Sequence, residues 1–277
     1  MLFGGTYLTL SLGMSYSVFM SKLSILHSFL IYILAINFLT SCLNASKAKQ
    51  SAVYKVEIAN SFMDGRNYPA ALKELLSAEQ DDPNNAQVQE SLGHVYLARE
   101  RLELAEKHYL NALDLDPNFT DVRNSLARLY IETGRLNKSE EFLKVAMNDL
   151  TYIPYHRTLA NYGVLEFKRK SFSKAVDYFK KSLEKDRENC DTNVYLGRSY
   201  LEAKDLEMAI KQFEKSISFC SQVNSDAAHY YSAISLYRKN EVARAQTRFE
   251  ELIKLYPEGF HSEKARKMLS LIKSETP

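Results

Sequence analysis

The side chains that could carry chemistry are few and scattered along the 277-residue chain. Three cysteines and six histidines are present, and no two histidines have the spacing of a metal-binding pair. The HExxH, GxSxG, Walker and GxGxxG motifs and a CxxC pair are all absent. We therefore expect no enzyme activity, no metal and no cofactor. The histidines are His27, His94, His108, His156, His229 and His261.

Composition argues against two further classes of ligand. The 36 Lys and Arg against 34 Asp and Glu give a formal charge of +2, so the chain is not a generic polyanion binder. The densest basic run, residues 167–170, falls where a helix is expected to end. Nine glycines and six prolines predict few loops and no glycine-rich phosphate cradle. We expect a folded, helix-rich chain with no nucleic-acid partner and no small-molecule substrate.

Cys42 has the most informative sequence context of the three cysteines. It follows a 17-residue apolar run at positions 23–39, which is short for a membrane-spanning helix of about 20 residues. Residues 39–42, Leu-Thr-Ser-Cys, resemble the lipobox of bacterial lipoproteins. That resemblance implies a signal peptide over residues 1–41, lipidation of Cys42 and a location on the periplasmic face of the bacterial outer membrane, because Leu43 stands where an inner-membrane protein usually has Asp. A plain transmembrane anchor is the alternative.

The start of the signal segment has two readings. Counted from Met1, the first 21 residues carry no charge, whereas a start at Met20 gives the sequence Met-Ser-Lys and 22 residues before Cys42. The second length is ordinary for a signal peptide, so we expect Met20 to be the true start.

A repeat of about 34 residues fills the rest of the chain. Within each repeat, position 8 is Gly or Ala, position 20 is Ala or Ser, and position 24 is a large apolar residue. Three repeats carry proline at position 32: Pro83, Pro117 and Pro257. These positions resemble the tetratricopeptide repeat (TPR), in which two antiparallel helices, A and B, pack closely at the small residues. The six repeats begin at Ala52, Ala86, Thr120, His156, Cys190 and Asp226.

The resemblance implies an all-α fold, a right-handed α-solenoid of six repeats. We expect the signal peptide over residues 1–41, a lipidated cysteine and short linker over 42–51, the repeats over 52–259, and a capping helix and tail over 260–277. The apolar spacing of residues 262–274 predicts the capping helix. A solenoid needs such a helix to cover its last repeat.

Cys190 and Cys220 stand at the two ends of repeat five. Cys190 opens helix A and Cys220 closes helix B, and antiparallel helices bring those ends together. In an oxidising periplasm a disulfide would join them. Two separate buried thiols are an equal alternative.

Helix A of a TPR lines a concave groove, mainly through positions 2, 5, 9, 12 and 13, as the family's architecture implies. Position 12 is apolar in all six repeats, which suggests a groove for a helix or an extended peptide of a partner protein. Packing of position 12 against the neighbouring helix is the alternative. The carboxylate clamp of chaperone-binding TPRs is not matched, since Val56, Ser91 and Asp121 occupy its places. The candidate partner-binding residues are Met63, Leu97, Arg128, Ile131, Phe167, Leu201, Tyr230 and Tyr237.

A lipobox followed by six TPRs resembles the pilotin-type lipoproteins of type IV pilus systems and the related gliding-motility lipoproteins. The stretch 148–163 carries the most specific likeness, with two extra residues, a tyrosine-containing loop, an Arg and an Asn-x-Gly. The chain departs from the family in lacking the position-32 proline in repeats three to five. The resemblance implies a non-enzymatic factor that binds the secretin, the outer-membrane pore subunit, and promotes its multimerisation while a lipid anchor holds it at the membrane.

Two other functions compete with this one. Residues 256–265 are similar to the last repeats of TPR proteins in outer-membrane protein assembly and in cell-envelope coordination. A lipoprotein scaffold for β-barrel insertion or peptidoglycan machinery is therefore the first alternative. An accessory to an envelope enzyme, for instance in polysaccharide export, is the second.

Overall fold

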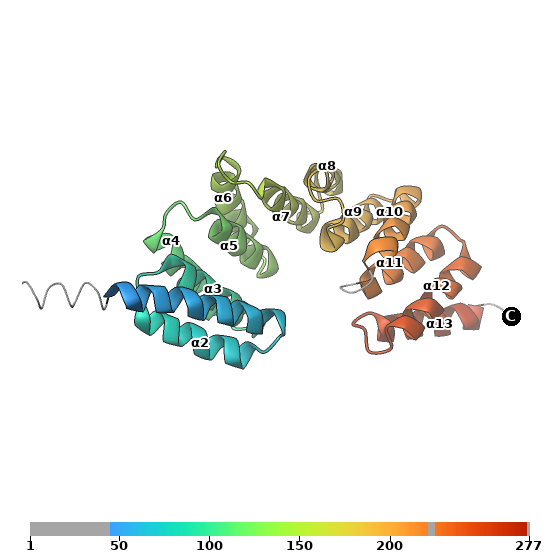
Figure 1. The fold of residues 1–277 in the computed structure, drawn as a ribbon. Coiled ribbons are helices and arrows are strands. Elements are labelled where there is room, and N and C mark those ends of the chain that lie inside the picture. The colour runs from blue at the N-terminus through green and yellow to red at the C-terminus, as the bar shows by residue number, and fades with distance from the viewer. Residues whose placement is uncertain (1–44, 221–224, 276–277) are drawn as a thin grey trace, which may run out of the picture. The chain divides into compact units, whose positions relative to one another are not determined.

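The computed structural model of the chain describes residues 45–220 and 225–275 (Figure 1). All regular elements within these ranges are helices. None of the helices found there is both long and apolar enough to cross a bilayer. The signal segment, the start at Met20 and the lipidated Cys42 predicted from the sequence lie outside the described residues. The chain divides into two compact units, Met1–Arg101 and Leu102–Pro277.

The first unit contains helical residues 45–64, followed by α2 (Tyr68–Asp81) and α3 (Ala86–Ala98). Its core is built of small and medium side chains from all three helices, including Ala59, Leu75 and Val88. The helix at 45–64 includes residues 45–51, which belong to the stretch 42–51 predicted to hold the lipidated cysteine and a short linker. Asn85 caps α3, because its side-chain oxygen accepts hydrogen bonds from the amides of Gln87 and Val88.

The second unit contains helices α4 to α13. Consecutive helices pack against one another, and the A helices α5, α7, α9 and α11 also contact their A-helix neighbours along the row. These A helices begin at or within one residue of the repeat starts expected from the sequence. The helices are α4 (Leu102–Leu115), α5 (Thr120–Glu132), α6 (Leu136–Met147), α7 (Tyr155–Lys168), α8 (Phe172–Leu183), α9 (Cys190–Glu202), α10 (Leu206–Phe219), α11 (Ser225–Arg238), α12 (Val242–Leu255) and α13 (Ser262–Glu275).

The turn that ends each A helix has the same backbone conformation in all six repeats. Position 15 is left-handed in every one, with φ between 56° and 74°. The amide that follows it donates a hydrogen bond to the carbonyl five residues earlier, as in Asn67 to Phe62 and Arg135 to Tyr130. This is the Schellman arrangement, which satisfies carbonyls at a helix end. The residues at position 15 are Arg66, Glu100, Gly134, Lys170, Lys204 and Asn240.

The small residue at position 8 makes room for the aromatic ring at position 24. A Cβ atom added to Gly163 would lie 2.4 Å from Cε1 of Phe179, and one added to Gly197 would lie 2.5 Å from Cε1 of Phe213. Both rings are fully buried, so neither can move aside without disturbing the core. The repeat pattern thus encodes the contact between helices A and B directly.

Helix α13 covers the last repeat. Ala265 and Ile272 from α13 join Ala233 from α11 and Phe249 and Leu252 from α12 in one cluster. The outer face of α13 carries exposed charges, among them Lys267 and Glu263, which form an ion pair of 2.6 Å. An apolar inner face and a charged outer face are what a terminal repeat requires.

Candidate partner-binding surface

The residues predicted to face a partner fall into two groups. Arg128, Phe167, Tyr230 and Tyr237 are half-buried on the A helices of the second unit, with part of each side chain reaching solvent. The Arg128 side chain is 35% exposed and its Nε atom donates to Oε1 of Glu132 at 2.9 Å. Met63 and Leu97 are also half-buried and belong to the first unit.

Ile131 and Leu201 are not available to a partner. Both are 1% exposed and belong to the core cluster of the second unit. The reason is the neighbouring repeat: each of these A helices packs against the next A helix, so a side chain at position 12 is covered where the neighbour is close. For these two residues the alternative reading of position 12, packing between helices, is the one that the structure shows.

An aromatic seam runs along the A helices of repeats four to six. We use this name for Phe167 on α7, Tyr195 on α9, and Tyr230 and Tyr231 on α11. Phe167 meets Tyr195 edge-on with ring centroids 5.6 Å apart, and Tyr230 meets Tyr231 edge-on at 5.3 Å. The spacing and tilts are those of favourable aromatic pairs. Half-buried rings of this kind give a protein partner a large contact area at low entropic cost.

Two arginines lie against the seam. The guanidinium carbon of Arg198 lies 4.7–5.1 Å from the ring centroids of Phe167, Tyr195 and Tyr231. Arg128 lies 5.9 Å from the centroid of Tyr195. Arg198 was not among the predicted site residues. The signal was present in the sequence, because repeats five and six share a tyrosine at position 6 and repeat five has an arginine at position 9.

Beyond the seam, His261 at the start of α13 extends the ring contacts. Its ring stacks on Tyr230 with centroids 5.0 Å apart, and its backbone amide donates to Oδ2 of Asp226 at 3.0 Å. Burial lowers the pKa of His261 below its ordinary value, although Asp226 acts in the opposite direction. The charge of Arg198 contributes to the lowering.

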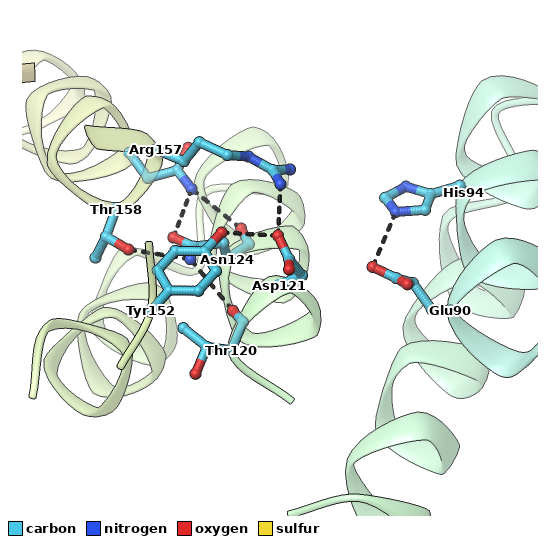
Figure 2. Close-up of polar contacts among 9 residues, drawn as sticks. Glu90, His94, Thr120, Asp121, Asn124, Tyr152, Arg157 and Thr158 are labelled. Carbon is cyan, nitrogen blue, oxygen red and sulfur yellow. Dashed lines mark hydrogen bonds and ion pairs between the residues drawn. The ribbon is translucent and has the colours of Figure 1, made fainter. Parts of the chain in front are cut away.

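The loop between α6 and α7 is held to α5 by a polar network (Figure 2). The Tyr152 hydroxyl donates to Oδ1 of Asp121 at 2.7 Å, and the Arg157 guanidinium donates to the same oxygen. Thr120 Oγ1 donates to Oδ2 of Asp149 at 2.5 Å. The pilotin-family resemblance rests partly on a tyrosine-containing loop and an arginine. In the structure, Tyr152 of that loop and Arg157 both bind the Asp121 carboxylate, and together they clamp the loop to α5.

A second set of amide contacts locks α5 to α7 beneath this loop. Asn124 Nδ2 donates to Oγ1 of Thr158 at 3.0 Å, and Asn161 Nδ2 donates to Oδ1 of Asn124 at 3.1 Å. Asn124 is 2% exposed, so its hydrogen bonds are shielded from water. The clamped loop presents two almost fully exposed apolar side chains, Leu150 and Ile153.

Cys190 and Cys220 are joined by a disulfide in the structure, with their Cα atoms 5.7 Å apart. Cys190 is the first residue of α9, and Cys220 caps the end of α10 and is 1% exposed. The bridge therefore closes repeat five at the end opposite to its A/B turn.

Titratable groups elsewhere in the described residues do not assemble into a metal site. No group of three or more His, Cys, Asp or Glu side chains there could hold a metal ion. His94, His156 and His261 each lie within 4.0 Å of a carboxylate. For His94 and Glu90, the Nε2 and Oε1 atoms lie 3.5 Å apart (Figure 2). A depression of about 390 Å³ between α6, α7 and α8 contains Arg169, but Glu140 and Glu166 already pair with that arginine.

The helical hairpins, the small-residue contacts and the recurring turn define a repeat scaffold of two-helix units. Sequence models of the tetratricopeptide repeat match residues 56–118, 96–161, 193–222 and 227–259. The chain is a TPR-repeat protein. The all-α fold predicted from the 34-residue period is thereby confirmed, and no enzyme family is indicated. None of the curated proteins matches the chain.

Solved structures share the fold at low sequence identity. The PilF protein of Pseudomonas aeruginosa is 18% identical, with a TM-score of 0.65 over 80% of this chain and 99% of PilF. PilW, described as a widely conserved type IV pilus biogenesis factor, is 20% identical, with a TM-score of 0.70 over 78% of this chain and 98% of PilW. Cut9, in its complex with Hcn1 from the APC/C, is 17% identical, with a TM-score of 0.70 over 81% of this chain and 45% of the other.

Proposed function

We propose that the protein is a non-enzymatic, lipid-anchored assembly factor of a type IV pilus, which binds the secretin subunit through the A-helix face and promotes its multimerisation. The observation that carries the proposal is the aromatic seam with its two arginines, a surface built to contact another protein. The likeness to PilF and PilW supports the choice of pilus, because the chain spans nearly the whole length of both.

The anchor gives this surface its place in the proposed mechanism. Acylated Cys42 would hold the A-helix face at the periplasmic surface of the outer membrane, since several acyl chains at about 0.8 kcal/mol per buried CH₂ bind a bilayer stably. Confinement raises the effective concentration of bound secretin where it must insert. Catalysis is not needed for this role, because binding and confinement alone favour assembly.

A deletion strain tests the function. We expect the secretin of that strain to remain largely monomeric in membrane fractions and surface pili to be lost, and we expect the wild-type gene to restore both. Secretin multimers at wild-type levels in the deletion would contradict the proposal. A loss of outer-membrane β-barrels in general, with secretin multimers intact, would favour the β-barrel assembly alternative.

Two matched variants test the surface in the same strain. Arg128 on α5 and Lys144 on α6 each pair with a glutamate four residues away, at 2.9 Å and 3.1 Å. Arg128→Glu reverses a charge beside the seam, and we expect it to restore multimers poorly. Lys144→Glu makes the same change on a B helix and should restore them fully. Equal restoration by the two variants would exclude the A-helix face around Arg128 as the binding surface.

Replacement of Cys42 tests the anchor independently. Cys42→Ser should leave the helical circular dichroism spectrum unchanged and release the protein from the outer-membrane fraction. Unchanged fractionation of this variant would rule out lipidation at Cys42.

A further inference from the structure

The environment of Arg198 is unusual within this molecule. Its guanidinium is surrounded by three rings from three consecutive A helices: Phe167 at 4.8 Å, Tyr195 at 5.1 Å and Tyr231 at 4.7 Å, measured to the ring centroids. We call Phe167, Tyr195 and Tyr231 the Arg198 cage. Since each ring belongs to a different repeat, the cage forms only when repeats four, five and six are stacked.

The cage rings rest on the hydrophobic core, which fixes their positions. Tyr195 stacks on Phe179 with centroids 5.8 Å apart, and Tyr231 stacks on Phe213 at 6.0 Å. Phe179 and Phe213 are fully buried in the A/B contacts of repeats four and five. Core packing therefore fixes the geometry of the cage before a ligand binds. Binding then carries little entropic cost for ordering the rings.

The charge of Arg198 has no acidic partner among residues 45–220 and 225–275. Four other partly buried arginines of repeats three to six pair with glutamates, and a fifth, Arg123, donates to the backbone carbonyl of Pro117. The four pairs are Arg128 with Glu132, Arg135 with Glu106, Arg169 with Glu140 and Arg248 with Glu214. Acidic groups near the cage are already engaged. Glu202 lies 4.0 Å from Arg238, and Asp226 contacts His261.

Rings alone leave the hydrogen-bonding capacity of this group unused. A guanidinium has five N–H donors, and contact with an aromatic face stabilises its charge without satisfying those donors. A ligand that supplies an acceptor to this partly buried guanidinium gains both a hydrogen bond and a charge interaction. The planar fork of arginine matches a carboxylate in a bidentate fashion.

We propose that Arg198 binds the carboxylate of an Asp or Glu side chain in an extended segment of the partner protein, with apolar neighbours of that residue lying against the Arg198 cage. The inference rests on the proposed function, because it takes the A-helix face to be where the partner binds. A single positive charge without an acidic partner among the described residues matches one carboxylate.

Selection from a phage-displayed library of random 12-residue peptides tests the proposal without knowledge of the partner. With the full-length protein as bait, we expect selected peptides to share an Asp or Glu flanked by apolar residues. Arg198→Gln should abolish that enrichment and weaken a selected peptide at least tenfold by fluorescence anisotropy. Arg198→Lys should bind with intermediate affinity, because it keeps the charge and loses the fork. Lys211→Gln, on an exposed site of α10, is the matched control and should bind as the wild type does.

The outcomes separate this inference from the proposed function. Thermal melting of each variant first establishes that it is folded. Peptides without acidic enrichment, or equal enrichment on the Arg198→Gln protein, would overturn the inference. If Arg198→Gln also restored secretin multimers in the deletion strain, the inference would fail while the pilus function stood. Multimers in the deletion strain itself would remove the pilus function, and acidic enrichment would then describe a different partner.

Discussion

Repeats three and five both lack the proline that follows α4 and α12, and their junctions with the next repeat are held by different interactions. After α6, Asp149 accepts hydrogen bonds from Thr120 and Thr151, and Tyr152 donates to Asp121. At the end of α10, a covalent bond joins Cys220 to Cys190. The first junction depends on hydrogen bonds to the carboxylates of Asp149 and Asp121. The second depends on the redox state of its surroundings, so the two should respond to different conditions.

Removal of the disulfide should have the largest effect. Cys190→Ala with Cys220→Ala opens a loop whose ends are 30 residues apart, and we expect a loss of about 3–4 kcal/mol in the free energy of unfolding. Urea denaturation with and without reductant measures it. The reductant should destabilise the wild type and leave the double variant unchanged. If mass spectrometry detected both Cys190 and Cys220 as alkylatable thiols in unreduced protein isolated from cells, the bridge would not form in the cell.

Truncation of Asp121 should come next. Asp121→Ala leaves the half-buried Tyr152 hydroxyl and the Arg157 guanidinium without their acceptor, and we expect a cost of about 2 kcal/mol. Urea denaturation under reducing and oxidising conditions checks whether the two junctions are independent. If they are, the losses from the disulfide and from Asp121 should add within about 0.5 kcal/mol.

A proline at position 32 of repeat three should destabilise the first junction. Thr151 occupies position 32, and its amide donates to Oδ1 of Asp149 at 3.0 Å. Thr151→Pro removes that donor, so it should destabilise by about 1 kcal/mol although proline is the residue that other repeats use. Thr151→Ala keeps the amide and serves as the control in the same denaturation series. Stabilisation by the proline would mean that the Asp149 contact contributes nothing.

Acid should have the smallest of these effects, a partial loss of the stabilisation that Asp149 gives to the first junction. The hydrogen bonds from Thr120 and then Thr151 lower the pKa of Asp149 below 3.8, its value in an unfolded chain. Its contribution is therefore complete above pH 3.8 and is lost as the pH falls through the lower, folded-state pKa. The difference in unfolding free energy between the wild type and Asp149→Asn should shrink from pH 5 to pH 2. The disulfide contribution should stay constant over this range.

Much of the fold could be predicted because the packing of helices A and B requires small and large residues at fixed positions of each repeat. Gly163 and Gly197 are where a Cβ atom would collide with a buried phenylalanine, and that requirement recurs every 34 to 36 residues. The turn conformations were harder to predict from the sequence. In repeat one the left-handed residue is Arg66 and not the neighbouring Gly65, and only Gly134 among the six turns combines glycine with this conformation.

The candidate surface was predicted less well, because exposure on an A helix depends on the neighbouring repeat. Phe167 and Leu201 share position 12, but Leu201 is 1% exposed whereas Phe167 is half-buried and belongs to the aromatic seam. The Arg198 cage draws its rings from three repeats. Analysis of one repeat at a time does not reveal such a cluster, although comparison of positions 6, 9 and 12 between adjacent repeats would.

The cross-link in repeat five also has a mechanical consequence. Under the proposed function, a lipid anchor and a bound partner would place the chain between them under tension. Tension along the backbone would pass through the bridge between Cα atoms 5.7 Å apart and bypass α9, the A/B turn and α10. The 30-residue segment that the disulfide closes has an extended length of about 100 Å at about 3.3–3.6 Å per residue, and the bridge prevents this segment from being stretched. Repeat five, which supplies Arg198, would keep its shape under a load that extends its neighbours.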